Sequence, residues 1–250
     1  MLDLTQEPRA RLPQEALRPA RFARLARLVR KTLAAYDRLM GKARYDDFRL
    51  ERVHGVPLLV TPTVFNPLLP RTGAFLAQHL DARQVSADAE VLDMGTGSGV
   101  CAIFAARHAR RVVAVDVNAA AIRCAGLNAL LNHVEHRIEF RHGDLFAPVA
   151  GERFDLIVFN PPFLQGVPQG DRDRAWRSSD IAERFAAGLG NHLKPRGAAL
   201  LVLSTFGDAS RFLEQLRRHG FSISVLAERS FINERLAIFK LEQPSATGAP

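Results

Sequence analysis

Three alternating glycines follow an apolar run in the middle of the chain. Gly95, Gly97 and Gly99 come directly after residues 91–94 and lead into a second apolar run. Glycine lets the backbone turn sharply and approach a ligand without a side-chain collision. A helix that starts at such a turn points its free N–H groups at whatever lies above the strand end. The pattern predicts a cofactor loop of the nucleotide-binding type, and the alternative is a strand–helix turn that holds no ligand.

The spacing of these glycines distinguishes between classes of cofactor. A dinucleotide fingerprint needs G-x-G-x-x-G, and its third glycine position is occupied here by Val100. The sequence instead has the pattern D-x-G-x-G-x-G, with Asp93 two residues before Gly95 and Thr96 after it. A NAD-dependent oxidoreductase is disfavoured further, because no Tyr-Lys or His-Asp pair for hydride transfer stands near the predicted strand ends.

An acidic residue ends the next predicted strand, because Asp116 closes residues 111–116 and stands 21 positions after Gly95. A carboxylate at this place can accept hydrogen bonds from both ribose hydroxyls of an adenosine. The alternative is that Asp116 only caps the following helix. Val117 and Asn118 are expected to border the adenine.

A second acidic residue stands where the third strand is expected to end. Asp144, followed by Leu145 and Phe146, can accept the amino hydrogen of an adenine while Phe146 faces the ring. We place all three in the same cofactor site. The alternative for Asp144 is an ordinary turn residue.

The fourth predicted strand, residues 154–159, ends in Asn160-Pro161-Pro162-Phe163. The two prolines make the backbone stiff and have no N–H groups, so carbonyl oxygens stay free to accept hydrogen bonds. The Asn160 side-chain oxygen and the Pro161 carbonyl can both accept from one substrate NH2 group. Holding that nitrogen in line with an electrophilic methyl group would stabilise the positive charge that develops on it. Phe163 offers a face for a planar amide or base.

These motifs together identify a resemblance. Residues 48–241 resemble the S-adenosylmethionine (SAM)-dependent N-methyltransferases that carry an (N/D)-P-P-(F/Y) motif. The chain is most similar to the release-factor glutamine methyltransferases (the HemK/PrmC type) and to the small-domain ribosomal RNA guanine methyltransferases. The resemblance implies SAM as the methyl donor and a planar amide or exocyclic amine nitrogen as the acceptor. A protein glutamine is the leading acceptor, and an RNA base or a small-molecule amine are the alternatives. A catalytically inactive scaffold that works through its basic arm is the non-enzyme alternative.

Residues 55–67 are similar to the hairpin and loop that precede the catalytic core in the glutamine enzymes. The resemblance implies that Phe65, Pro67 and Thr72 lie beside the methyl donor. Two departures concern the substrate. No acidic residue follows Thr72, and the region before residue 48 is too short for the helical recognition domain of that family.

The elements around these motifs alternate between strand and helix from residue 90 onward, which predicts an α/β fold. We expect a Rossmann-like, seven-stranded, mainly parallel sheet with helices on both faces and an antiparallel last strand. A hairpin with its turn at residues 54–55 and a short helix precede it. Strands are predicted at 90–94, 111–116, 137–141, 154–159, 197–203, 221–227 and 234–241, and helices at 74–80, 99–108, 119–131, 179–192 and 208–218.

The charge is concentrated at the N-terminus. Of a net charge of +8, residues 1–50 carry +6, from 12 Lys and Arg against 6 Asp and Glu. Apolar residues recur at helical steps over residues 18–42, with arginines between them. Residues 1–47 are predicted to form a basic helical arm, either a solvated cap or a docking surface for RNA, the ribosome or an acidic protein. Residues 242–250 are predicted to be a disordered tail.

Other features exclude several classes of protein. Two cysteines, Cys101 and Cys124, are too few for a disulfide framework or a metal site, and His133 and His136 lack further metal ligands. No apolar run is long enough to span a membrane and no signal peptide is recognisable, so we expect a cytoplasmic protein. The long segment 164–178 beside the Asn-Pro-Pro-Phe motif has a length typical of lids, but the sequence leaves open whether it is one. Trp176 either contacts substrate or only anchors the loop.

Overall fold

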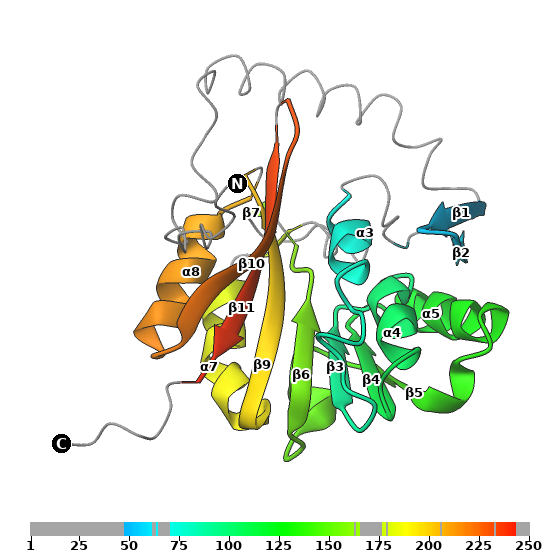
Figure 1. Cartoon of the computed structure of the whole chain (residues 1–250), viewed down its shortest axis with the longest axis horizontal. Helices are drawn as coiled ribbons and strands as arrows, with labels where there is room; N and C mark the ends of the chain where they lie inside the picture. The colour runs from blue at the N-terminus through cyan, green and yellow to red at the C-terminus, as the bar shows by residue number, and fades with distance from the viewer. Residues whose placement is uncertain are drawn as a thin grey trace, which may run out of the picture.

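The computed structural model describes residues 48–61, 64, 71–162, 164–165, 177–178, 180–205, 207–232 and 234–243. The predicted N-terminal arm, the predicted C-terminal tail beyond residue 243, Phe65, Pro67, Phe163 and Trp176 lie outside these residues. Figure 1 shows one twisted sheet with helices packed against it. The sheet has seven strands in the order β10-β11-β9-β6-β3-β4-β5, which confirms the predicted fold class.

The bounds of the seven strands agree with the predicted positions within a few residues, except at one strand. They are β3 (Glu90–Met94), β4 (Arg111–Asp116), β5 (Ile138–His142), β6 (Phe154–Phe159), β9 (Leu193–Ser204), β10 (Ser222–Ser230) and β11 (Arg235–Glu242). Strand β9 begins at Leu193, four residues before the predicted start. The chain becomes extended there because Leu193 pairs with Phe154 before a register shift between Phe154 and Leu156.

The last strand is antiparallel, as predicted, and it lies inside the sheet rather than at its edge. Strand β11 pairs antiparallel with both β9 and β10, while β9, β6, β3, β4 and β5 run parallel. Because β10 and β11 are joined by a tight turn, no crossover helix is needed between them. The carboxyl ends of the parallel strands therefore meet at one edge of the sheet.

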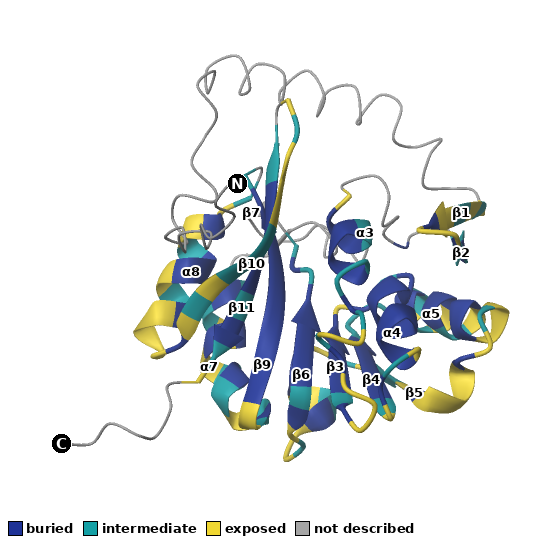
Figure 2. Cartoon of the chain, viewed as in Figure 1, coloured by how far each residue is buried: buried dark blue, intermediate teal, exposed yellow. Residues whose placement is uncertain are grey.

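Helices cover both faces of the sheet because strand residues alternate between two cores. Val91 and Val112 belong to the core on one face, whereas Leu92 and Val113 belong to the core on the other. Figure 2 shows the central strands buried and the outer helix surfaces exposed. The helices are α3 (Thr72–Ala77), α4 (Val100–Ala106) and α5 (Ala119–Leu131) on the first side, and α7 (Ile181–His192) and α8 (Ala209–Arg218) on the second; single 3-10 turns form η1 (Glu135–Arg137) and η2 (Ala147–Val149).

The predicted N-terminal hairpin is present but does not join the main sheet. Strands β1 (Arg49–Val53) and β2 (Val56–Val60) pair only with each other and lie beside α5 (Figure 1). A short pair of strands, β7 (Leu164–Gln165) and β8 (Arg177–Ser178), brackets the segment that follows the Asn-Pro-Pro motif. Among the described residues, no helix is both long and apolar enough to cross a membrane.

Candidate active site

The glycine loop connects β3 to α4 at the carboxyl edge of the sheet. Gly97 has a φ of 56° and Gly99 a φ of 85°, in the left-handed region that favours glycine. The N–H of Thr96 donates to the Val115 carbonyl at 3.0 Å, so the loop is fixed to the end of β4. A Cβ atom on Gly99 would lie 3.0 Å from Ala125, because α5 packs directly against the backbone of the loop.

Asp93, at the end of β3, is a buried carboxylic acid that accepts hydrogen bonds from two neighbouring groups. Its Oδ2 accepts from the Thr96 hydroxyl at 2.6 Å and from the Ala102 N–H at 2.9 Å. Burial raises the pKa of Asp93 to about 7, although these two donors act in the opposite direction. The group therefore titrates near neutrality and would be stabilised as a carboxylate by a cationic ligand.

Asp116 joins the glycine loop to the start of α5. Its Oδ2 accepts from the Gly97 N–H at 2.9 Å, and its Oδ1 accepts from the Asn118 N–H at 2.8 Å. The helix cap is Asn118, whose side chain accepts from the Ala120 N–H at 2.9 Å. Asp116 is thus not the cap of α5, and its carboxylate borders the cavity with acceptor capacity remaining on both oxygens. Burial raises the pKa of Asp116 as well.

Asp144 reaches the same cavity and is paired with a residue that the sequence analysis missed. Arg184 of α7 donates to Asp144 Oδ2 at 2.5 Å, across 40 positions of sequence. The Arg184–Asp144 pair is about half exposed, so it contributes little to stability. Nothing in the local sequence indicates this pairing, because it depends on how α7 packs against the sheet.

Phe146 corrects one expectation, because it does not line the cavity. Its ring stacks on His192 with 4.3 Å between ring centroids and also contacts Phe185, within the core under α7. Gly188 leaves the space for this ring, since a Cβ there would lie 2.5 Å from Phe146 Cδ2. Apolar packing under α7 has taken the ring away from the position expected to face an adenine.

Asn160 stands at the end of β6 with a side-chain oxygen that lacks a partner. Its Oδ1 is buried, and no hydrogen-bond donor lies within reach among the described residues. Leaving a buried amide oxygen unpaired costs about 1–3 kcal/mol. Asn160, Pro161 and Pro162 all line the cavity. Asn160 therefore brings to the cavity an amide oxygen that has no donor among the described residues.

One cavity brings most of the predicted site residues together. Two predicted residues besides Phe146 do not line it: Gly99 forms the N-cap of α4, and Thr72 is buried at the start of α3 with its hydroxyl unpaired among the described residues. The predicted residues that line the cavity are Asp93, Gly95, Thr96, Gly97, Asp116, Val117, Asn118, Asp144, Leu145, Asn160, Pro161 and Pro162.

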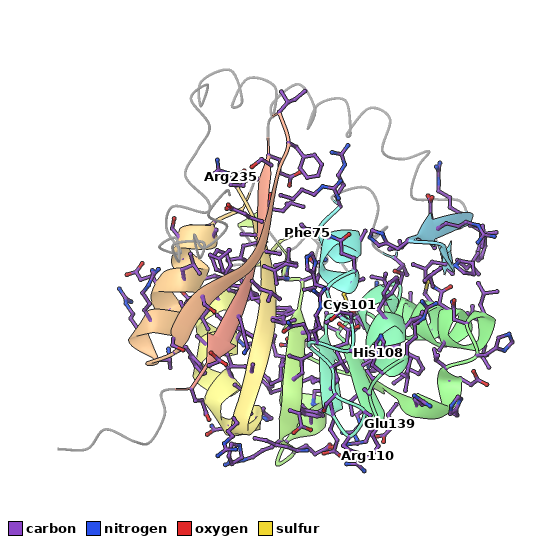
Figure 3. The ribbon with its side chains drawn as sticks, viewed as in Figure 1. Phe75, Cys101, His108, Arg110, Glu139 and Arg235 are labelled. Atoms are coloured by element: carbon purple, nitrogen blue, oxygen red, sulfur yellow. The ribbon has the colours of Figure 1, made fainter. Side chains whose placement is uncertain are left out.

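The cavity also includes residues that no sequence motif indicated. Gly73 and Ile181 come from the first turns of α3 and α7, and Cys101 of α4 lies beside α3 with Sγ 4.0 Å from the Gly73 carbonyl (Figure 3). The described residues that line the cavity include three aspartates and neither lysine nor arginine. Arg184 pairs with Asp144 from outside the lining, so Asp93 and Asp116 are the two aspartates with no lysine or arginine partner among the described residues. Such a lining favours a ligand with positive charge and hydrogen-bond donors, which agrees with the sulfonium, amino group and ribose hydroxyls of SAM.

A model of the methyltransferase small domain family matches residues 58–228. The chain belongs to this family. It is a SAM-dependent N-methyltransferase, and the family expected from its motifs is confirmed.

The relatives of this methyltransferase are named either for ribosomal RNA or for glutamine as the methylated group. Ribosomal RNA small subunit methyltransferase C of Alcanivorax borkumensis is 37% identical over 134 residues, which are 54% of this chain and 38% of that protein. A putative protein N5-glutamine methyltransferase of Methanocaldococcus jannaschii is 30% identical over 196 residues, or 74% of this chain and 95% of that protein. The release factor glutamine methyltransferase of Koribacter versatilis is 33% identical and is covered over 68% of its length.

Among solved structures, the T. thermophilus 16S rRNA methyltransferase RsmC in complex with AdoMet and guanosine superposes with a TM-score of 0.60. The identity is 23%, and the match covers 79% of this methyltransferase and 50% of that chain. This likeness supports the Rossmann-like fold. The chain spans well under half of the A. borkumensis relative but nearly all of the M. jannaschii relative.

Proposed function

We propose that this methyltransferase transfers the methyl group of SAM to the side-chain amide nitrogen of a protein glutamine. The observation that carries this proposal is the buried Oδ1 of Asn160 at the cavity, which has no partner in the part of the chain that the structure describes. An acceptor oxygen there is matched to an NH2 group, which offers two hydrogens. A thiolate or an apolar carbon acceptor would leave that oxygen without a donor.

The residues that would hold SAM are those at the carboxyl ends of β3, β4 and β5. Asp116 would accept hydrogen bonds from the ribose hydroxyls, and the glycine loop would lie against the donor. Asp93 would offset positive charge on the bound donor, while Val117, Asn118, Asp144 and Leu145 would border the adenine. Thr72, with its unpaired hydroxyl beside Gly73, is proposed to lie near the methyl donor.

The chain's own part in the reaction is to orient and stabilise the acceptor nitrogen. SAM supplies an electrophilic methyl group on a sulfonium, and S-adenosylhomocysteine is the leaving sulfide. Asn160 Oδ1 and the Pro161 carbonyl accept hydrogen bonds from the two N–H groups of the methyl-accepting amide. These bonds direct its nitrogen toward the methyl carbon. As the N–C bond forms and the C–S bond breaks, positive charge grows on the nitrogen and strengthens both hydrogen bonds. The proton then passes to solvent, so no general base is required.

A protein glutamine is favoured because the relative that this chain covers over 95% of its length is named a putative protein N5-glutamine methyltransferase. The exocyclic amine of an RNA base is the second candidate, since the A. borkumensis relative is named for ribosomal RNA. The basic residues 1–50 would assist capture of either acceptor. A cytoplasmic location, where such acceptors are made, stays a prediction.

Transfer of labelled methyl groups from SAM into separated protein and RNA fractions tests this proposal. We expect label in protein, located at glutamine by mass spectrometry, and its loss with Asn160→Ala. Label in RNA alone would replace the first candidate with the second. Absence of label from protein, RNA and metabolite fractions, with SAM bound, would reject the proposed acceptor chemistry.

A further inference from the structure

Asn128 of α5 is a fully buried polar residue that no motif assigned to the site. Its Oδ1 accepts from the Leu59 N–H at 2.6 Å, and its Nδ2 donates to the Leu59 carbonyl at 2.7 Å. The same Nδ2 donates to the Ser98 carbonyl at 2.9 Å. These partners determine the orientation of the amide, because Leu59 offers one donor and one acceptor while Ser98 offers an acceptor.

The two partners of Asn128 belong to different functional parts of the molecule. Ser98 lies in the glycine loop, lines the cavity and is almost fully buried. Leu59 lies in β2, in a hairpin that pairs with no other strand among the described residues. A two-stranded hairpin is at best marginally stable alone, so its contacts with α5 determine how well it is ordered.

Two of the described residues that follow this hairpin, Val64 and Gly73, lie beside or at the cavity. Val64 packs against Ala121 and Cys124 of α5, and Ala121 lines the cavity. The next described residues, 71–73, lead into α3, where Gly73 lines the cavity as well. Val64 therefore packs against a residue that lines the cavity, and Gly73 lines the cavity itself.

We propose that Asn128 is a positioning residue that couples SAM binding to the order of the β1–β2 hairpin. A bound donor holds the glycine loop still and keeps the Ser98 carbonyl in place. The amide of Asn128 then has both N–H groups satisfied and stays aligned with Leu59. When the loop moves, one N–H loses its acceptor and the amide can rotate away from the hairpin. SAM bound first would thus order the hairpin before the acceptor arrives.

Hydrogen exchange with SAM alone tests this coupling, which rests on the proposed cofactor site. In the wild-type protein, saturating SAM should slow exchange in the hairpin (residues 49–60) by about tenfold, within the 5- to 150-fold range of coupled sites. Exchange in β10, at the far edge of the sheet, is the internal reference for a general gain in stability. In Asn128→Ala, SAM should still protect residues 94–100 but no longer slow exchange in the hairpin.

Asn132→Ala is the matched control. Asn132 lies one turn further along α5, and its Nδ2 donates to the Pro57 carbonyl at 2.9 Å. Among the described residues, its side chain donates to the hairpin and to α5 itself, so the variant should loosen the hairpin yet keep its response to SAM. A merely structural role for Asn128 would make the two variants behave alike, and that result would overturn the proposal.

Two further outcomes are informative. An unchanged hairpin in the wild-type protein, with residues 94–100 protected by SAM, would overturn the coupling and leave the cofactor site standing. Lack of protection at residues 94–100 would reject the cofactor site and the coupling with it. If Asn128→Ala does not fold, Asn128→Leu replaces it. Leucine fills a similar volume without a donor or an acceptor, so the response should again be lost.

Discussion

Asn160 and Asp93 line the same cavity in opposite states of hydrogen bonding. The Asn160 side-chain oxygen is buried without a partner among the described residues, whereas Asp93 already has two donors. At Asn160 an acceptor oxygen lacks a hydrogen bond, and at Asp93 a carboxyl group has a pKa near neutral pH. Each therefore predicts a different response to substitution or pH.

Replacing Asn160 should affect the transition state more than the binding of the donor. Removing one preorganised hydrogen-bond partner typically lowers kcat by about 10²–10³-fold, or about 2.7–4 kcal/mol. Asn160→Ala should show this loss with nearly normal SAM affinity and melting temperature. Asn160→Asp, which keeps an acceptor oxygen, should retain partial activity. If Asn160→Ala methylates at the wild-type rate, the assignment of the acceptor site is wrong.

Asp93 predicts a pH dependence of SAM affinity. Its pKa is raised from 3.8 to about 7 by burial, so the folded protein holds a proton that the unfolded chain has released between about pH 4 and 7. The contribution of Asp93 to the free energy of unfolding therefore falls as the pH rises from about 4 to 7. A cationic ligand favours the carboxylate, so SAM should bind up to about tenfold more tightly at pH 8 than at pH 6.

Calorimetric titration of SAM at both pH values measures this effect. Asp93→Asn is the control, because it keeps the ligand's own titration and removes that of the side chain. An equal pH dependence in both proteins would assign the effect to SAM or to Asp116, whose pKa is also raised by burial.

At the scale of elements, the close packing of α5 on the glycine loop predicts opposite effects for two glycines. Gly99→Ala places a Cβ 3.0 Å from Ala125 at a φ of 85°, and should lower the free energy of unfolding by about 1–3 kcal/mol. Gly126→Ala lies within α5 with no atom near the added Cβ, and should raise it by up to about 1 kcal/mol. Urea denaturation without ligand measures both. Equal effects would mean that α5 does not contact the loop as described.

At the scale of the whole molecule, SAM should stabilise the fold and NAD should not. Ligand at a hundred times its dissociation constant adds about 2.7 kcal/mol, which corresponds to a rise in Tm of about 5–11 °C for a protein of this size. Differential scanning fluorimetry with SAM, S-adenosylhomocysteine and NAD tests this. Asp116→Ala should reduce the shift without unfolding the protein, and a shift with NAD alone would contradict the cofactor assignment.

The uneven charge predicts a salt-dependent capture of the acceptor. Replacing Arg21, Arg24, Arg27 and Arg30 by glutamine removes four of the 12 basic residues in the first 50. If the acceptor complex is polyanionic, KM should rise and its dependence on salt should flatten, while kcat at saturation barely changes. Steady-state kinetics at two salt concentrations would show this. An unaltered salt dependence would leave residues 18–42 as a solvated cap.

Sequence alone determined the features that neighbouring residues encode. The alternation of apolar runs predicted the sheet, the three glycines predicted the loop after β3, and Asn160-Pro161-Pro162 marked the end of β6. Such signals are local, because turning, capping and alternation depend on residues a few positions apart. The positions of β9 and α3 were less accurate. Pairing with β6 starts β9 four residues early, and α3 follows the left-handed Arg71 at Thr72, two residues before its predicted start, and ends three residues before its predicted end.

Only the tertiary structure decided contacts between distant residues. It placed Phe146 under α7 rather than in the cavity, joined Asp144 to Arg184, and brought Asn128 to both Leu59 and Ser98. It also inserted β11 between β9 and β10. These outcomes depend on which surfaces pack together in three dimensions. Burial, space and hydrogen-bond partners across tens of residues determine them, and no short stretch of sequence contains that information.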